Sequence, residues 1–325
     1  MKVWGLALAL SLFGLSATAQ DKTVELKISI WLPPGHPLVP ATREWAGSIE
    51  RQSAGTIKSV VLASEQLGKA VDYYDMARDG VADIAFVNPG YQIGRFPVIA
   101  AGRVPFTFAD GNKGTAALDD WYRRYGAPEM KDTHFCLAFI HDPGTSHGRK
   151  RVAVPDDIKG MKICPAGSEL AQMMTLLGGI NIQQGDADAL FFPWGSMSLL
   201  GLDKVLKYHI DAPVYSTAFV YTMNKTKYDG MSAAQKKVID LHCTTEWAVK
   251  LSSSWQAFEA SGRNKTKAAA GQEVYALSPD QLRAWRASAV PVQRAWADTV
   301  TKSGGNADAL YREFQSSIAR YGAGF

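Results

Sequence analysis

The sequence contains little cysteine, with only Cys136, Cys164 and Cys243 among its 325 residues. That number excludes a small scaffold held together by several disulfides, and it allows at most one bridge within the chain. The three residues also lie too far apart for a zinc knuckle. Whether one pair forms a bridge or all three are buried as small apolar side chains stays open at this point.

No charge of one sign dominates the composition. There are 35 Lys and Arg residues against 31 Asp and Glu residues, a net charge of +4, and the one basic run, Arg149 to Arg151, is short. This distribution excludes a nucleic-acid partner, which would require a basic surface. Hydrophobic residues make up 46% of the chain, enough for one or two sizeable cores, which excludes a disordered protein.

Long hydrophobic runs are also missing, apart from one short apolar stretch at the start. Lys2 precedes the apolar segment 3–15, and Ala17-Thr18-Ala19 follows before Gln20. A charged start, a short apolar segment and small residues at the end are typical of a secretory signal peptide, here cleaved after Ala19. We expect an exported, soluble chain that begins at Gln20, carries no lipid, and resides in the periplasm.

The motifs of the common enzyme classes are absent, including a Gly-x-Ser-x-Gly elbow, a phosphate-binding Gly-Lys-Ser/Thr loop and a dinucleotide fingerprint. His134, His141 and His147 lie six or seven residues apart rather than at the i, i+4 spacing of a helical metal site. Asp142 beside His141 could form an acid–base pair, but neighbours on an extended chain point in opposite directions. No metal, no cofactor and no catalytic activity are expected.

Strands and helices alternate in the first third of the mature chain. Polar–apolar alternation predicts a strand over 24–31, and further strands are predicted over 57–62 and 82–87, with helices over about 40–52 and 68–79 between the strands. This order predicts an α/β fold with largely parallel strand pairing.

Part of the sequence occurs twice, 105 residues apart. Gly80, Ala82, Asp83, Phe86 and Gly90 of the first copy correspond to Gly185, Ala187, Asp188, Phe191 and Gly195 of the second. Each copy leads from Gly-x-Ala-Asp into an apolar strand and ends in a turn that contains proline. The pattern predicts two lobes of similar build whose strand-end turns face each other across a ligand cleft. Chance similarity between two strand starts is the alternative.

The last third of the sequence is predicted to be helical. Ser232 and Gln235 form a capping box, and no proline interrupts the pattern up to about residue 270. One continuous helix of that extent would be about 55 Å long and could brace both lobes. Further helices are predicted to begin at Ser278-Pro279 and to cover 307–321.

Several of these segments together resemble a known family, the extracytoplasmic solute receptors of TRAP (tripartite ATP-independent periplasmic) transporters, the DctP-like group. The resemblance covers nearly all of the mature chain. The segments that carry it are Ser64 to Gly68, Asp79 to Asp83, the signature-like run Pro155 to Ile163, Met223 to Lys225, and Ser232 to Val238.

This resemblance implies a two-lobed periplasmic-binding-protein fold with a ligand cleft between the lobes and a long bracing helix. Residues 20–143 plus about 214–253 would form the first lobe, and about 144–213 plus 254–325 the second. The implied function is to bind a small organic acid and deliver it to the TRAP membrane permease, the only membrane contact. A weakened or non-binding relative, or an exported enzyme on the same fold, is the alternative.

The sequence departs from the family pattern at the expected binding site. Cys164 stands where the family usually has an arginine that holds a substrate carboxylate, and a thiol supplies neither forked donors nor a fixed charge. Phe192 stands where an asparagine is frequent, which indicates a more apolar wall. Between the positions of Gly179 and Asp188 the family typically has a strand and a helix. Here only residues 180–187 lie between them, about ten residues fewer, so we expect this helix to be missing.

Candidate binding residues follow the strand ends. We expect aromatic stacking, together with Asn and Ser hydrogen bonds, to select a small aromatic or monocarboxylic solute. The positive charge would come from His36 or from an arginine that the sequence does not place. The ten candidates are Trp31, His36, Asn88, Tyr91, Asp142, Thr145, Cys164, Phe192, Trp194 and Ser196.

Overall fold

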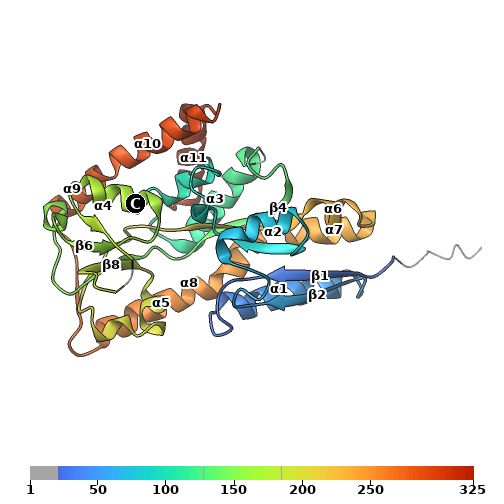
Figure 1. The fold of residues 1–325 in the computed structure, drawn as a ribbon, viewed down its shortest axis with the longest axis horizontal. Coiled ribbons are helices and arrows are strands. Elements are labelled where there is room, and N and C mark those ends of the chain that lie inside the picture. The colour runs from blue at the N-terminus through green and yellow to red at the C-terminus, as the bar shows by residue number, and fades with distance from the viewer. Residues whose placement is uncertain (1–20, 127, 184) are drawn as a thin grey trace, which may run out of the picture.

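The computed structural model describes residues 21–126, 128–183 and 185–325, and it contains two β-sheets surrounded by helices (Figure 1). The predicted signal peptide and its cleavage site lie outside the described residues. Within these three ranges no helix is both long enough and apolar enough to cross a membrane.

The first sheet has the strand order β2-β1-β3-β10-β4. β1 pairs in parallel with β2 and with β3, whereas β10 is antiparallel to both β3 and β4. The bounds of these strands are β1 Val24–Ser29, β2 Ile57–Leu62, β3 Ile84–Val87, β4 Thr133–Ile140 and β10 Ala218–Asn224.

The second sheet has the order β11-β9-β5-β8-β6-β7. β6 is parallel to β7 and β8, and β9 is parallel to β11, whereas β5 is antiparallel to β8 and β9. Its strands are β5 Thr145–Gly148, β6 Lys162–Cys164, β7 Ile180–Asn181, β8 Ala189–Phe192, β9 Tyr208–Ile210 and β11 Glu273–Tyr275.

The prediction of largely parallel pairing is wrong for two strands, β5 and β10. The chain passes from the first sheet to the second between β4 and β5, and returns between β9 and β10. The strand that follows each of these two crossings runs antiparallel to both of its neighbours. The two crossing segments are joined by an antiparallel β-bridge between Gly144 and Tyr215, in which Gly144 N–H donates a hydrogen bond to Tyr215 O at 2.8 Å.

The repeated sequence pattern corresponds to a repeated structure. In the first sheet the Asp83 carboxylate accepts a hydrogen bond from Lys27 N–H at 2.7 Å, and Asp83 N–H donates to Lys27 O. In the second sheet Asp188 and Lys162 make the same two hydrogen bonds, with the carboxylate accepting at 2.8 Å. In both places the aspartate directly precedes one strand and binds the backbone of its parallel neighbour, so the similarity is not a chance match.

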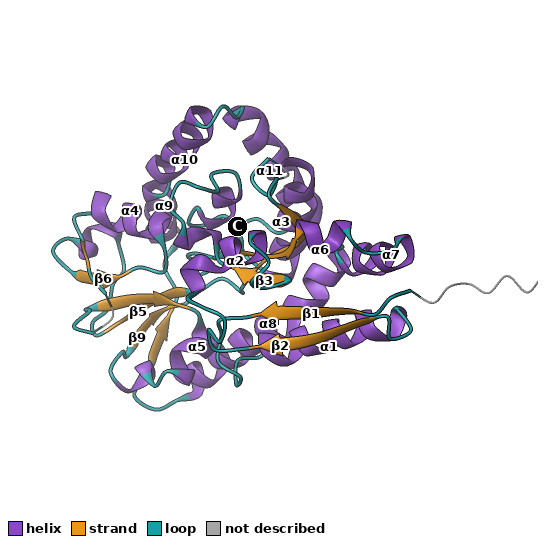
Figure 2. Cartoon of the chain, turned by 45° about the vertical axis from the view of Figure 1, so that its right-hand side comes forward, coloured by secondary structure: helices purple, strands orange, loops and turns teal. Residues whose placement is uncertain are grey.

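The helices lie around the sheets, as the two views in Figures 1 and 2 show. The α-helices are α1 Leu38–Gln52, α2 Tyr73–Arg78, α3 Gly111–Tyr125, α4 Ser168–Leu176, α5 Trp194–Leu199, α6 Lys225–Asp229, α7 Ala233–His242, α8 Thr245–Ala268, α9 Pro279–Ser288, α10 Val290–Lys302 and α11 Ala307–Tyr321. Short 3₁₀ helices are η1 Ala70–Asp72, η2 Pro89–Tyr91, η3 Ile99–Arg103, η4 Pro155–Ile158 and η5 Leu202–Lys204.

The long helix predicted from residue 233 to about 270 is interrupted, so this prediction is wrong in one respect. α7 ends at His242 and α8 begins at Thr245. Thr244 caps the new helix, because its side chain accepts a hydrogen bond from Trp247 N–H. Cys243, between the two helices, has φ −105° and ψ 59°, which lie outside the helical region, and it forms a disulfide.

α8 still serves as the brace between the sheets. Its 24 residues span about 36 Å, and it packs on α1, α3 and β4 at one end and on α5 and β11 at the other. Figure 1 shows it running from α5 toward α1. The contact with α5 is very close, because a Cβ atom on Gly262 would lie 2.4 Å from the Cα atom of Gly195.

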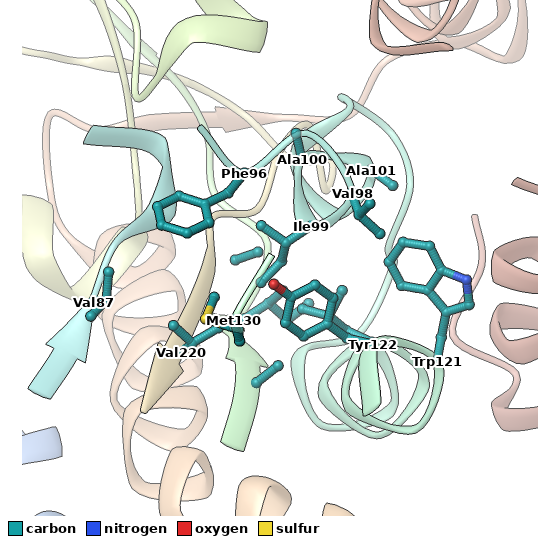
Figure 3. Close-up of a cluster of buried hydrophobic side chains, with 14 of the residues drawn as sticks. Val87, Phe96, Val98, Ile99, Ala100, Ala101, Trp121, Tyr122, Met130 and Val220 are labelled. Carbon is teal, nitrogen blue, oxygen red and sulfur yellow. The ribbon is translucent and has the colours of Figure 1, made fainter. Parts of the chain in front are cut away.

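The C-terminal helices complete the core on one side of the first sheet. Trp121 of α3 packs against Phe314 of α11 with ring centroids 4.5 Å apart. Val300 of α10 is buried in the same cluster, part of which is shown in Figure 3. The division of the chain between two lobes stays a prediction.

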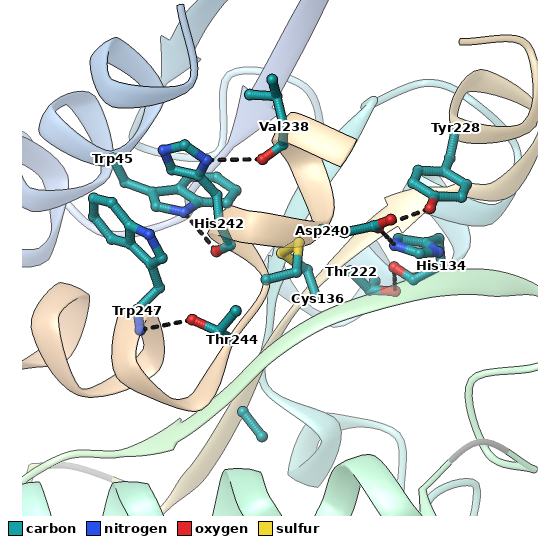
Figure 4. Close-up of a disulfide and its surroundings, with 12 residues drawn as sticks. Trp45, His134, Cys136, Thr222, Tyr228, Val238, Asp240, His242, Thr244 and Trp247 are labelled. Atoms are coloured by element: carbon teal, nitrogen blue, oxygen red, sulfur yellow. Dashed lines mark hydrogen bonds and ion pairs between the residues drawn. A yellow bond between two sulfur atoms is a disulfide. The ribbon is translucent and has the colours of Figure 1, made fainter. Parts of the chain in front are cut away.

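One disulfide forms, between Cys136 of β4 and Cys243 after α7, and Cys164 is free. Both bonded cysteines are buried in a core beneath α1. Figure 4 shows that the neighbouring groups are also tied together, for example by Trp45 Nε1–H, which donates to His242 O at 3.0 Å. The bridge that the sequence left open is therefore present.

The shortened segment before Asp188 forms an edge strand. β7 pairs with β6, and no helix lies in 182–183 or 185–188. Leu176 and Ile180 are 56% and 53% exposed beside this edge. Apolar side chains are thus uncovered where the sequence analysis expected a missing helix.

Candidate functional site

A cavity of about 560 Å³ lies between the two sheets, beyond the ends of β1, β3, β6 and β8. Ligand sites of open α/β sheets occur at this place, past the carboxyl ends of parallel strands. The two Pro-containing turns of the repeated pattern both contribute to its lining, through Asn88 and Gly90 on one side and Phe192 and Pro193 on the other. The strand-end turns therefore meet at one cavity, as predicted.

Six aromatic residues contribute to the cavity wall, more than any other kind of side chain. Trp31 stacks on Phe86 with ring centroids 5.3 Å apart and lies 5.9 Å from Tyr91. Phe219 and Trp255 lie beside each other at 5.2 Å, and both line the cavity. Flat, apolar walls of this kind fit a ring-shaped solute and leave few partners for a solute with many hydroxyl groups.

The two histidines of the lining are neutral at neutral pH. The pKa of His36 is lowered to about 4, mainly by burial and to a smaller extent by the nearby His141. Burial also lowers the pKa of His141 to about 4. His36 Nδ1 accepts from Leu38 N–H at 3.2 Å, and His141 Nε2 accepts from Thr217 N–H at 3.1 Å. His36 therefore does not supply the positive charge that the sequence analysis considered.

The cavity lining contains one arginine. Within the described ranges, Arg103 is the only Arg or Lys residue in the cavity lining. It lies at the end of η3, and its Nε and Nη2 atoms donate to the carboxylate of Glu169 at 2.9 and 2.7 Å. Its Nη1 atom is buried and has no hydrogen-bond partner.

The short helix that carries Arg103 is held by a partly buried carboxylate, Glu129. Glu129 accepts hydrogen bonds from Val98 N–H and Ile99 N–H at the start of η3, and from the Tyr122 hydroxyl at 2.8 Å. Burial raises the pKa of Glu129 to about 7. The short helix that carries Arg103 is thus held at its first turn.

Residues 28–299 match the model of the bacterial extracellular solute-binding protein family 7, DctP. The chain belongs to this family. The match covers most of the described chain, from the end of β1 to α10, and includes all residues that line the cavity.

Solved structures of TRAP solute-binding proteins have the same fold. One from Rhodoferax ferrireducens, with copurified benzoate, has 25% identity and a TM-score of 0.85, and the alignment covers 92% of this chain and 99% of that one. One from an unidentified marine microbe, specific for aromatic acids and bound to 3-hydroxybenzoate, has 27% identity and a TM-score of 0.85, with 93% and 99% covered. One from Bordetella bronchiseptica with bound mandelate has 24% identity and a TM-score of 0.83, with 91% and 99% covered.

In this DctP-family chain, six of the ten predicted site residues line the cavity. They come from the loops after β1, β3 and β8 and from the start of α5. The six residues are Trp31, His36, Asn88, Tyr91, Phe192 and Ser196.

The other four predicted residues lie outside the lining. The Thr145 hydroxyl donates to Ile210 O at 2.7 Å, and the Asp142 carboxylate accepts from Gly111 N–H at 3.0 Å. Burial raises the pKa of Asp142 to about 6. Trp194 packs edge-on against a buried histidine, and Cys164 is a half-buried free thiol that precedes a lining proline.

The sequence analysis missed Arg103. One signal was available, because Arg103 is the only charged residue in the apolar stretch 97–108. A lone charge in such a stretch must find a buried partner or face a ligand.

Glu259 was also missed, because it lies in the middle of a helix with no unusual local pattern. Its side chain is buried on α8 and accepts from Gly195 N–H, from the Ser196 hydroxyl at 2.8 Å and from Trp255 Nε1–H at 2.8 Å. Ser196 and Trp255 both line the cavity. Glu259 thus positions two wall residues without lining the cavity itself.

Proposed function

We propose that this chain is the solute receptor of a TRAP transporter. It binds a small organic acid in the cavity between its two sheets and delivers the acid to a membrane permease. The observation that carries the proposal is the aromatic cavity with one arginine, located where the two strand-end turns meet. Export through a signal peptide cleaved after Ala19 would place the chain in the periplasm.

The chemistry of the cavity favours an aromatic acid. Trp31, Tyr91, Phe192, Phe219 and Trp255 present ring faces and edges to the bound solute. The structures from Rhodoferax ferrireducens and the marine microbe, which bind benzoate and 3-hydroxybenzoate, support the same solute class.

Binding would be coupled to closure of the two lobes. The lining comes from both sheets, so a solute that contacts both halves favours the closed arrangement. The paired crossing segments at Gly144 and Tyr215 are the natural hinge, because the chain passes between the sheets there. The permease would recognise the closed receptor.

The contacts of the one candidate acid–base pair argue against catalysis. His141 Nδ1–H donates to Asp142 O at 2.6 Å while Nε2 accepts from Thr217 N–H, so both ring nitrogens are engaged. The Asp142 carboxylate points to a backbone amide instead of the imidazole. We therefore infer that the solute leaves the site unchanged.

Blocking the cavity is expected to abolish thermal stabilisation by aromatic acids. Ala166 lines the cavity, and Ala166→Trp would place an indole in the space of the solute. We expect affinity for benzoate or 3-hydroxybenzoate to fall at least about 30-fold, equivalent to about 2 kcal/mol. A thermal-shift titration of the mature chain measures this change.

The matched control is Ala234→Trp, at an exposed position of α7 that is not part of the cavity lining. It should leave both the melting temperature and the ligand-induced shift close to those of the parent chain. Equal ligand-induced shifts in the Ala166→Trp variant and the parent chain would show that the acid binds elsewhere.

A further inference from the structure

Arg103 has a donor group that no atom of the described residues accepts from. The side chain is 9% exposed, and two of its three nitrogens bind Glu169. The third, Nη1, is buried without a hydrogen-bond partner. An unpaired donor on a buried cation is costly, and a carboxylate is the acceptor that relieves this cost best.

Gly90 packs closely against Nη1, and the lack of a side chain at this position allows the close approach. A Cβ atom on Gly90 would lie 3.0 Å from Arg103 Nη1 and 3.0 Å from Asn88 Oδ1. Gly90 N–H donates to Asn88 Oδ1 at 2.9 Å, which holds this turn next to the guanidinium. Asn88, Gly90 and Arg103 all line the cavity, so Nη1 lies directly beneath the Gly90 turn of the cavity wall.

Two other unpaired donors belong to residues of the same wall. Trp31 Nε1 and Tyr215 Oη are buried and have no hydrogen-bond partner. A solute with one charged end and a polar ring substituent would provide acceptors for these groups.

We infer that Arg103 is the carboxylate-binding residue of this cavity, and that the solute is a monocarboxylate whose remaining body is an uncharged ring. This inference rests on the proposed function. Arg103 takes the part that the family resemblance assigns to the position of Cys164, where the thiol has no positive charge to offer.

The partner of Arg103 limits the charge of the solute. Glu169 belongs to α4 beside the second sheet, whereas η3, which carries Arg103, contacts β10 of the first sheet. The ion pair therefore joins the two halves of the protein and holds the guanidinium in one orientation. A second carboxylate on the solute would lie near Glu169 and would find no further Arg or Lys among the described lining residues.

The test removes the charges of Arg103 and Glu169 and keeps side chains of similar shape at both positions. The double variant Arg103→Gln with Glu169→Gln replaces the ion pair by two amides that can still bond to each other, so no buried charge is left unpaired. Affinities of the mature chain for benzoate, 3-hydroxybenzoate and mandelate, and for the amide of each, are measured by isothermal titration calorimetry. The parent chain is expected to prefer each acid that it binds to its amide by about 100-fold.

In the double variant this preference should fall to within about threefold, through loss of acid binding with little change in amide binding. The matched control is Arg95→Gln with Asp75→Asn, an ion pair with an N–O distance of 2.8 Å whose residues do not line the cavity. It should leave the acid-to-amide ratio unchanged.

Three outcomes would overturn the inference or what it rests on. An acid-to-amide ratio that survives in the double variant would show that Arg103 is only structural, and the receptor function would stand. If the chain binds dicarboxylates or sugar acids and none of the three aromatic acids, the inferred solute class is wrong, whereas the receptor function stands. A parent chain that binds no organic acid would refute the proposed function itself.

Discussion

Replacing both Cys136 and Cys243 by alanine is expected to lower the free energy of unfolding by about 4 kcal/mol. The disulfide closes a long loop, since the two cysteines are 107 residues apart in the sequence. Closing such a loop restricts the unfolded chain strongly, and both cysteines are buried in one core. Urea denaturation followed by tryptophan fluorescence measures the change.

The free cysteine provides the matched control for this prediction. Cys164→Ala leaves the bridge intact and should change the free energy of unfolding by less than about 1 kcal/mol. Reducing the parent chain should reproduce the effect of the double replacement. If the reduced protein is as stable as the oxidised one, the bridge does not hold β4 to the junction of α7 and α8.

Glu259→Ala is expected to destabilise the chain by about 4 kcal/mol, because it leaves three buried donors without their acceptor. Those donors are Gly195 N–H, the Ser196 hydroxyl and Trp255 Nε1–H. Because Ser196 and Trp255 also line the cavity, affinity for aromatic acids should fall as well. Urea denaturation and calorimetry measure the two effects.

Glu246→Ala, at an exposed position in the first turn of the same helix, is the control and should cost less than about 1 kcal/mol. Equal losses in the two variants would mean that α8 is sensitive to any substitution. In that case the loss of stability in Glu259→Ala could not be assigned to the hydrogen bonds of Glu259.

Glu259 also gives a pH dependence with a definite sign. Burial raises its pKa from 4.5 to about 7, so the folded chain binds the proton more tightly than the unfolded chain. This contribution to stability is complete below about pH 4.5 and is lost as the pH rises through about 7. The stability of the parent chain relative to Glu259→Gln should therefore fall by up to about 3 kcal/mol from about pH 5 to pH 8.

A good part of the fold could be predicted from the sequence because local patterns specify it. Polar–apolar alternation placed β1, the strands β2 and β3 were predicted after it, and the Ser232 and Ser278 capping boxes placed the starts of α7 and α9. The repeated Gly-x-Ala-Asp segments predicted two similar halves, and the aspartates make the same hydrogen bonds in each. The family resemblance agrees with the DctP match.

Features that depend on distant contacts were not predictable in the same way. The direction of β5 and β10 follows from the crossings between the sheets, which no local pattern records. The break between α7 and α8 lies at Cys243, whose disulfide partner, Cys136, is 107 residues away in the sequence.

In the candidate site, too, the residues specified by a local pattern were predicted, and those that depend on distant contacts were not. Trp31, Asn88 and Phe192 were found because they stand directly after strands, where ligand sites occur. Arg103 reaches the cavity from a 3₁₀ helix, and Glu259 acts through two other side chains, so neither follows a strand. Thr145 and Trp194 have suitable positions in the sequence, but their side chains point into the second-sheet core and make contacts there.

Calorimetric titration of the mature chain with benzoate, 3-hydroxybenzoate and mandelate, followed by chromatography of the recovered solute, tests the central claim most directly. The account predicts saturable binding of one solute per chain, with a negative heat-capacity change from burial of the ring and full recovery of the unchanged acid. Absence of binding to any organic acid, or conversion of the acid into a product, would contradict it.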